Sequence, residues 1–375
     1  MAKEDNIIFF KPASQYENTG DVLINKALLV ILRKYGTIVV EDRNRPDWFL
    51  DVISSSAERL SQYSPNGVEK AIFSILIKNI FKRTKRKYIL VFPPGHTSRK
   101  GKNGAIQSLK GSLKLLILRW LGCKIIRIGF SIGPFDKINA IAESLRSRCF
   151  NLYALRDYGS ISLAKEWHFR NYKFAPDLAW SYEPINKSSG SDDYIVLSFR
   201  SNSYGTKYDK GYLEPVLVRL KEILSVGSLH EKEIVVAYQV LFDRDSSLQI
   251  VDFLSQDGWN VRLIDEKLTL DTAEQLYKNA AFVISNRLHV LLLAVQVETM
   301  AFPLVASLDN AKIVNIYKDN SLEDILLNME DDSSVNLRRF VNILDNKDET
   351  LKRVAKISSS NRQLIENEVS HLFAN

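Results

Sequence analysis

Short apolar runs alternate with amphipathic stretches along most of the chain, in the order strand, loop, helix. Runs of strand length are Asn6 to Phe10, Thr37 to Val40, Tyr88 to Phe92, Lys124 to Ile128, Asn151 to Leu155 and Tyr172 to Ala175. A second set is Tyr194 to Phe199, Ile234 to Tyr238, Val261 to Ile264, Ala281 to Ser285 and Glu298 to Phe302. Helices are predicted between them, as at Asp21 to Tyr35 and Ala105 to Leu121. This alternation predicts doubly wound, Rossmann-like parallel sheets with helices on both faces.

A polar segment that carries Pro, Gly and Ser separates the two sets of strands and is typical of an interdomain linker. The sequence therefore predicts an N-terminal α/β domain over 1–183, a linker over 184–193 and a C-terminal α/β domain over 194–375. The last of these ends in a helix from Lys347 to Phe373. A length of 375 residues fits two domains, which we expect to face each other across a cleft.

The composition, 45% hydrophobic and 25% charged, is that of a globular protein. The two cysteines, Cys123 and Cys149, fit a reducing compartment and form no disulfide framework. We expect no metal site, because histidines and carboxylates do not cluster at ligand spacing. The acidic start lacks a secretory signal and no apolar run approaches a membrane span, so we expect a cytoplasmic protein.

The net charge of +7 is concentrated behind one amphipathic stretch, Val68 to Phe81. Its basic residues are Lys78, Lys82, Arg83, Lys85, Arg86 and Lys87. A helix of this kind can lie on the anionic inner leaflet of the cytoplasmic membrane, so residues 68–87 are a candidate for peripheral attachment. The alternative is a core-facing helix with a solvated basic end. We expect no nucleic-acid partner, because aromatic residues do not interleave with the charges.

An arginine and a histidine, Arg287 and His289, stand between the strand at 281–285 and an apolar helix at 290–295. Free backbone N–H groups and the positive helix dipole converge at such a junction. An arginine offers a fork to phosphate or carboxylate, and a histidine can move a proton near neutral pH. The alternative is a solvated or locally paired charge, but burial between apolar segments is costly without a partner or a ligand. The pattern predicts a phosphorylated acid as ligand.

Further polar residues follow other predicted strands, where parallel sheets bind ligands. Arg200 follows 194–199, and Gln239 with Asp243 follows 234–238. In the first domain Asn18-Thr19-Gly20-Asp21 follows the first strand, and Gly129 to Pro134 follows 124–128. The simpler interpretation is that Thr19 and Asp21 cap a helix and that Gly20 makes a turn.

Taken together, these segments resemble the polysaccharide pyruvyl transferase family over nearly the whole chain. The motifs are Asn18 to Asp21, Ile128 to Phe135, Leu155-Arg156-Asp157 with Ser160, Pro176-Asp177, Leu197 to Arg200, Gln239 with Asp243, Ser285 to His289 with Ala294, and Asp309-Asn310-Ala311-Lys312. Their order and spacing carry the resemblance. The chain departs from the family pattern at Pro93-Pro94-Gly95-His96 and at Gln296 to Met300, where glycines are usual.

The resemblance implies a GT-B-like fold and transfer of the carboxyvinyl-derived unit of phosphoenolpyruvate to a sugar, as a cyclic ketal with release of phosphate. It implies that the donor binds to Arg200, Arg287, Leu288 and His289, and that His289 transfers a proton. Acceptor or cleft candidates are Asn18, Gly20, Asp21, Gln239, Asp243 and Lys312, and Asp21 is also a candidate catalytic residue. The implied acceptor is a lipid-linked glycan of exopolysaccharide or capsule biosynthesis, and we expect no cofactor beyond the co-substrate.

Two alternatives stay open. One is a nucleotide-sugar-dependent glycosyltransferase of the GT-B type, which would bind a nucleoside diphosphate in place of phosphoenolpyruvate. The other is a non-catalytic scaffold that binds glycan or membrane. The combination of Arg200, Arg287 and His289 argues against a scaffold.

Overall fold

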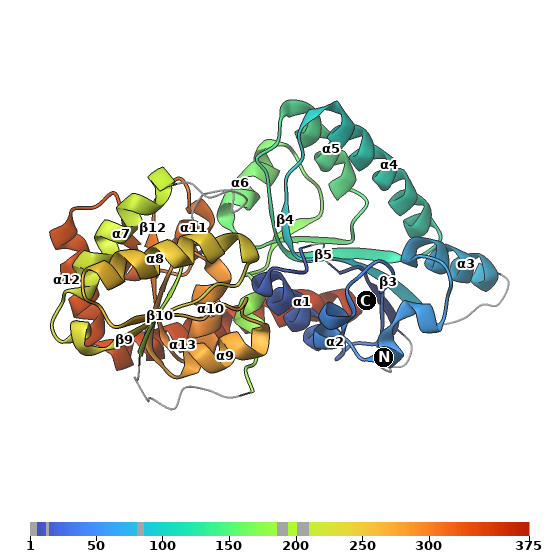
Figure 1. Cartoon of the computed structure of the whole chain (residues 1–375). Coiled ribbons are helices and arrows are strands. Elements are labelled where there is room, and N and C mark those ends of the chain that lie inside the picture. Colours follow the sequence, from blue (N-terminus) through green and yellow to red (C-terminus); the bar gives the residue numbers. More distant parts are fainter. Residues whose placement is uncertain (1–5, 13–14, 81–85, 186–193, 201–209, 375) are drawn as a thin grey trace. The chain divides into compact units, whose positions relative to one another are not determined.

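The computed structural model describes residues 6–12, 15–80, 86–185, 194–200 and 210–374, which form two compact units (Figure 1). Unit 1 comprises residues 1–16, 24–181 and 361–375, and unit 2 comprises residues 17–23 and 182–360. Most of the predicted linker, residues 186–193, lies outside the described residues. The predicted division differs from the compact units in three segments, because it placed 17–23 and 182–183 in the first domain and 361–375 in the second.

Unit 1 is built on a parallel sheet with the strand order β2-β1-β3-β5-β6-β7, to which β4 adds beside β5. Its strands are β1 (Asn6–Phe10), β2 (Thr37–Val40), β3 (Lys87–Phe92), β4 (Gly95–Thr97), β5 (Lys124–Ile132), β6 (Leu152–Leu155) and β7 (Tyr172–Phe174). Its helices are α1 (Thr19–Leu32), whose first residues belong to unit 2, α2 (Asp47–Ile53), α3 (Val68–Ile80), α4 (Gly101–Trp120), α5 (Lys137–Ser147) and α6 (Tyr158–Glu166). The short 3-10 helices are Ser56–Glu58, Leu60–Gln62 and Leu178–Ser181.

Strand β5 is longer than the sequence pattern predicts, since it continues past Ile128 to Ile132. The reason is a local irregularity at Gly129, where the pairing with β6 shifts register and the glycine adopts a φ of +73°. A glycine tolerates that conformation, so the chain absorbs one extra residue and stays in the sheet. Residues 129–132, which the sequence pattern placed after the strand, are therefore part of it.

Unit 2 is built on a second parallel sheet, with the strand order β10-β9-β8-β11-β12-β13. Its strands are β8 (Tyr194–Ser198), β9 (Glu233–Val236), β10 (Val261–Leu263), β11 (Ala280–Ser285), β12 (Met300–Val305) and β13 (Leu327–Asn328). Its helices are α7 (Lys210–Leu224), α8 (Arg244–Gln256), α9 (Leu270–Lys278), α10 (Leu288–Gln296), α11 (Ala311–Asp319), α12 (Ser333–Asp345) and α13 (Lys347–Ala374), whose end belongs to unit 1. The short 3-10 helices are Leu229–Glu231, Leu241–Asp243 and Glu323–Ile325.

Each unit has its own aromatic core. In unit 1 the ring of Tyr153 packs edge to face against Phe130 and Phe150, with centroids 4.7 and 5.2 Å apart. In unit 2 the rings of Phe302 and Phe340 lie 4.7 Å apart, and Phe282 packs against both. Aromatic pairs of this kind contribute roughly 0.5–1.5 kcal/mol beyond their buried area. The prediction of two parallel-sheet α/β domains with a terminal helix is confirmed.

The end of α13 belongs to unit 1 because its side chains bind the first sheet and its helices. Glu366 forms an ion pair with Lys34 at 2.6 Å, and Glu368 forms one with Lys173 at 2.8 Å. A sequence pattern identifies such a helix but does not say which sheet its last turns contact. The terminal helix therefore contributes to both units.

The amphipathic helix expected from residue 68 is present as α3. The basic residues Lys82, Arg83 and Lys85 behind it lie outside the described residues. No helix within the described ranges combines the length and the apolar character needed to cross a bilayer.

Candidate active site

The strand-end arginines of unit 2 occupy equivalent places on neighbouring strands. Ser198 of β8 and Ser285 of β11 are partners in the sheet register, and Arg200 and Arg287 each follow two residues later. The Ser285 hydroxyl donates to the Ser198 carbonyl at 2.5 Å and accepts from the backbone N–H of Arg287 at 2.9 Å. Both guanidinium groups therefore begin from one fixed edge of the sheet, as predicted for ligand-binding residues.

Asn286, which is 1% exposed, holds the segment of Arg200 in place. Its side-chain oxygen accepts from the backbone N–H of Arg200 at 2.8 Å, and its amide nitrogen donates to the Arg200 carbonyl and to the Tyr212 hydroxyl, both at 3.0 Å. The Tyr212 hydroxyl in turn donates to the side chain of Asn310 at 3.1 Å. These three residues form a rigid polar support under the two arginines.

Sequence reasoning missed the supporting roles of Asn286, Tyr212 and Asn310. Two of them stand inside motifs that were noticed, beside Arg287 and beside Lys312. An asparagine both donates and accepts, so a buried one next to a charged residue is a signal for a backbone clamp. Tyr212 carries no such signal, because it comes from a distant helix.

Arg287 is paired with Asp243. Its Nη2 donates to Asp243 Oδ1 at 2.5 Å, and its Nε forms an ion pair with Oδ2. The side chains are 15% and 2% exposed, and the hydroxyls of Ser246 and Ser247 donate to the Asp243 carbonyl at 2.8 and 2.9 Å. The pair therefore fixes the guanidinium through its Nε–Nη2 edge, so the donors that point away from Asp243 are both those of Nη1 and the second one of Nη2.

Among the residues that the structure describes, the charges around Asp243 do not balance. Arg200 acts on the same carboxylate as Arg287, so two guanidinium groups share one negative charge. Burial raises the pKa of Asp243 against the opposing pull of the two arginines. Burial and the nearby charge of Arg287 lower the pKa of Arg200, whose Nη2 donates to the Asp309 carbonyl at 2.8 Å. Among the described residues, the Arg200 Nε is buried without a hydrogen-bond partner. This arrangement makes the edge of the sheet a candidate site for an anion.

His289 lies in the first turn of α10, directly after Arg287 and Leu288. Its imidazole packs against Gly20, since a Cβ added at Gly20 would lie 2.7 Å from both Cβ and Cγ of His289. Any side chain at position 20 would displace the ring, so the contact requires glycine. Leu288 is the first residue of the helix, and the start of a helix attracts anions through its positive dipole end.

The segment Asn18 to Asp21 therefore belongs with the arginines and not with the first domain. Thr19 anchors it, since its hydroxyl donates to the Leu268 carbonyl at 2.5 Å and its N–H to the Gln239 carbonyl at 3.4 Å. The side chain of Asn18 accepts from the N–H of Gly20 at 3.0 Å. The structure thus brings Asn18, Gly20 and the start of α1 to the same unit as His289.

Two predicted site residues have other surroundings. Gln239 is 2% exposed, and its amide donates to the Tyr277 hydroxyl at 3.2 Å in the core of unit 2. Lys312, the second residue of α11, is exposed. The side chain of Gln239 therefore belongs to the core of unit 2, while its backbone carbonyl binds Thr19. Lys312 stays a predicted ligand contact.

A second buried arginine–aspartate pair lies in unit 1. Arg156 Nη1 binds Asp177 Oδ2 at 2.6 Å, and its Nε donates to the Ser131 hydroxyl at 2.8 Å. The two charged side chains are 4% and 0% exposed, and Asp177 Oδ1 also accepts from the N–H of Ala179 at 2.9 Å. The Ser131 hydroxyl donates in turn to the buried carboxylate of Asp157 at 2.6 Å, so this arginine is surrounded by negative charge and fixed dipoles.

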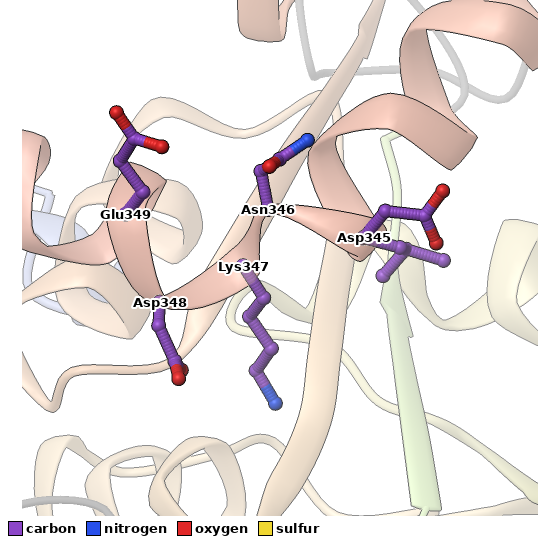
Figure 2. Close-up of a pocket in the computed structure, with 6 residues that line it drawn as sticks. Asp345, Asn346, Lys347, Asp348 and Glu349 are labelled. Atoms are coloured by element: carbon purple, nitrogen blue, oxygen red, sulfur yellow. The ribbon is translucent and has the colours of Figure 1, made fainter.

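A surface hollow of unit 2 lies where α12 meets α13 (Figure 2). It is lined by Leu344, Asp345, Asn346, Lys347, Asp348 and Glu349. Its labelled side chains point in different directions and three of them are carboxylates (Figure 2). None of the predicted site residues lines it, and its charge does not suit an anionic ligand.

The fold and the site define a two-domain α/β protein with two arginines at one edge of the sheet in its second unit. The chain is similar in structure to the UDP-GlcNAc 2-epimerase of Neisseria meningitidis bound to UDP-GlcNAc, with 11% identity, 99% of this chain and 100% of that chain covered, and a TM-score of 0.58. It is also similar to HepE of Anabaena in complex with UDP and glucose, with 12% identity, 99% and 100% coverage, and a TM-score of 0.56. These likenesses show a GT-B-like fold, as predicted.

The sequence identifies the family more narrowly. The pattern of the polysaccharide pyruvyl transferases matches residues 18–307, so the chain belongs to that family, which is one of transferases. The suspected resemblance is confirmed. No curated protein matches the chain in sequence.

Proposed function

We propose that the protein transfers the carboxyvinyl-derived unit of phosphoenolpyruvate to two hydroxyls of one sugar, forming a cyclic pyruvate ketal and releasing phosphate. Membership of the family supports the transfer of pyruvyl. The observation that carries the choice of donor is the pair Arg200 and Arg287, which shares the single carboxylate of Asp243 beside His289. Phosphoenolpyruvate carries a phosphate and a carboxylate, so it matches two guanidinium groups.

The donor is held by its two anionic groups. Arg287 is fixed by Asp243 along one edge and offers Nη1 to the ligand, and Arg200 is fixed through its backbone by Asn286. The N–H groups at the start of α10 add to the same positive field. Because the guanidinium groups are held before the ligand arrives, little reorganisation is needed to bind it.

The proton is supplied by His289. Protonation of the donor's methylene carbon gives an oxocarbenium-like centre, and the first sugar hydroxyl attacks that centre and loses its proton. The second hydroxyl of the same sugar then displaces the phosphate and loses its own proton. Asp21, next to Gly20 at the start of α1, is our candidate to contact or deprotonate an acceptor hydroxyl. General acid catalysis of this kind contributes typically ~10²- to 10⁴-fold.

The acceptor is proposed to be a glycan attached to a lipid, in the synthesis of an exopolysaccharide or capsule on the inner face of the cytoplasmic membrane. This part of the proposal rests on the family and on no contact in unit 2. The second candidate function is glycosyl transfer from a nucleotide sugar, favoured by the structural likeness to HepE in complex with UDP and glucose.

A product analysis separates the two functions. The protein is incubated with a glycolipid extract of the source cells and either phosphoenolpyruvate or UDP-glucose. The molecular masses of the glycolipids are then measured by mass spectrometry. We expect phosphoenolpyruvate to yield a species heavier by one pyruvate less one water, with release of phosphate. A glycolipid heavier by one hexose, formed with UDP-glucose, would establish the second function instead.

A further inference from the structure

Helix α4 of unit 1 has two apolar faces, one buried and one exposed. Its inner face is buried at Ala105, Ser108, Ser112, Leu115 and Leu118. Its outer face carries six large apolar side chains, each at least 43% exposed: Ile106, Leu109, Leu113, Leu116, Ile117 and Trp120. Their spacing of three or four residues places them on one stripe. A helix that served only the core of unit 1 would have a polar outer face.

Helix α5 extends this apolar surface. The two helices run side by side, joined at one end by the Gly101 N–H donating to Asp136 at 2.6 Å and in the middle by the Ser108 hydroxyl donating to Glu143 at 2.9 Å (Figure 1). At the other end Arg119 donates to the Arg148 carbonyl at 2.5 Å. The outer face of α5 exposes Ile138, Ile141 and Leu145. The two outer faces therefore adjoin, and we call them the α4–α5 face.

The charges of the α4–α5 face are basic. Helix α4 contains Lys102, Lys110, Lys114 and Arg119 and no acidic residue, and all four are exposed. In and beside α5 the exposed basic residues are Lys137 and Arg148. The acids of this region are used within it, because Glu143 is 1% exposed and Asp136 caps the start of α5. An apolar stripe between basic side chains complements a surface that is apolar inside and anionic outside.

We propose that the α4–α5 face docks unit 1 on an anionic lipid bilayer. Trp120, 85% exposed, is of the residue type that lies at the level of lipid headgroups. The lysines can extend along the apolar surface and place their ammonium groups among the phosphates. A helix of this kind lies in the plane of the interface and does not cross it.

A second copy of the chain fits this face less well. A twofold symmetric contact brings the same patch against itself, so Lys110 and Lys114 would meet lysines. The acidic residues that could neutralise these lysines are Glu143, which is buried, and Asp136, which caps the start of α5 and accepts from the Gly101 N–H. An anionic headgroup supplies the missing negative charge.

The proposed membrane contact lies on α4 and α5, whereas the sequence pattern predicted it at residues 68–87. Helix α3 exposes two large apolar residues, Phe73 and Ile77, and it lies against α4. It can therefore flank the surface, but the larger apolar stripe and the exposed tryptophan belong to α4. The proposal does not depend on the transfer reaction, because lipid binding is measured without donor or acceptor.

Co-sedimentation with vesicles tests the face. The full chain is mixed with vesicles of phosphatidylcholine alone or of phosphatidylcholine with phosphatidylglycerol. We expect binding to the anionic vesicles, reduced about tenfold or more by Leu113→Ser with Trp120→Ser and also by Lys110→Gln with Lys114→Gln. The matched control is Lys352→Gln with Lys356→Gln, an exposed pair at the same spacing on α13, which should bind like the wild type.

Tryptophan quenching gives a second measurement that does not depend on loss of binding. Trp120→Phe keeps an apolar side chain, so it should still bind, but it should lose most of the quenching by brominated lipids. Trp48→Phe, at a 43% exposed position of α2, should keep it. Unchanged binding in both double variants would overturn the proposal. So would loss of binding only when Lys82, Arg83, Lys85, Arg86 and Lys87 are replaced, or a dimer that the α4 variants dissociate with vesicle binding intact.

Discussion

Two buried arginine–aspartate pairs, one in each unit, differ in how their charges are balanced. In unit 1 Arg156 and Asp177 are 4% and 0% exposed and bind each other, and the Ser131 hydroxyl links Arg156 to a second buried carboxylate, that of Asp157. In unit 2 Arg287 is 15% exposed, and the positive charge of Arg200 also acts on the carboxylate of Asp243. All of these residues fall within motifs of the same family resemblance. We infer from the difference that the first pair holds the fold together and propose that the second, with its additional arginine, prepares a site for an anion.

The largest expected effect is on catalysis in unit 2. His289→Ala should fold and should lower the rate of phosphate release from phosphoenolpyruvate, with the glycolipid extract present, by ~10²- to 10⁴-fold, because the proton donor is lost. His230→Ala, which removes an exposed histidine of the same unit, is the control and should keep the wild-type rate. Wild-type turnover in His289→Ala would remove this residue from the mechanism.

The pair in unit 1 should respond in stability and not in binding. Arg156→Ala leaves the carboxylate of Asp177 buried without this partner, which typically costs about 3–5 kcal/mol in the free energy of unfolding. Urea denaturation measures that loss. The folded fraction should bind phosphoenolpyruvate with unchanged affinity. If Arg156→Ala weakened the affinity and left the stability as it was, the contrast between the two pairs would be lost.

The contact between Gly20 and His289 should affect the rate. Gly20→Ala places a methyl group where the imidazole lies, and a displacement of about 1 Å can cost ~10²-fold in rate. We expect a lower kcat with little change in the affinity for the donor, since the two arginines are untouched. Gly111→Ala is the control, because its added Cβ would meet its nearest neighbour at an ordinary 3.4 Å. Equal rates in both variants would refute the positioning role of Gly20.

The smallest expected effect comes from the charge of Asp243. Asp243→Asn keeps an acceptor for Arg287 but removes the negative charge that competes with the ligand, so sulfate should bind about tenfold more tightly. Calorimetric titration with sulfate measures this, because sulfate keeps its charge as the pH changes. Weaker sulfate binding in Asp243→Asn would mean that the carboxylate serves mainly to orient Arg287.

The same carboxyl predicts a pH response. Since burial raises the pKa of Asp243, the stability that it contributes is fully present below its unfolded pKa and is lost as the pH rises through the raised folded value. Sulfate affinity should therefore increase as the pH falls through that value. Asp243→Asn should lack this part of the response in both measurements.

The sequence predicted the positions of most strands, because buried parallel strands are short apolar runs. It missed the continuation of β5, because a glycine such as Gly129 is typical of a loop. The φ of +73° that keeps this glycine in the strand is visible only in the structure. It also placed Asn18 to Asp21 with the first domain, since chain order does not show that Thr19 is anchored to the carbonyl of Leu268.

For the candidate site, the sequence indicated which charged residues to consider but not how they pair. Arg200, Arg287 and His289 follow strand ends, where chemistry-bearing residues of such folds gather. The pairing of Arg287 with Asp243 depends on two side chains 44 positions apart in sequence. The supports Asn286 and Tyr212 depend on hydrogen bonds that no periodicity encodes.

The most direct test of the account is calorimetric titration of phosphoenolpyruvate into the wild-type protein, Arg287→Ala and Arg156→Ala, with UDP as the competing ligand. We predict that the wild type and Arg156→Ala bind phosphoenolpyruvate alike, and that Arg287→Ala binds it at least about tenfold more weakly, since a bond between charged groups is worth roughly 1.5–3 kcal/mol. Binding of UDP but not of phosphoenolpyruvate by the wild type, or equal affinity in all three proteins, would contradict the account.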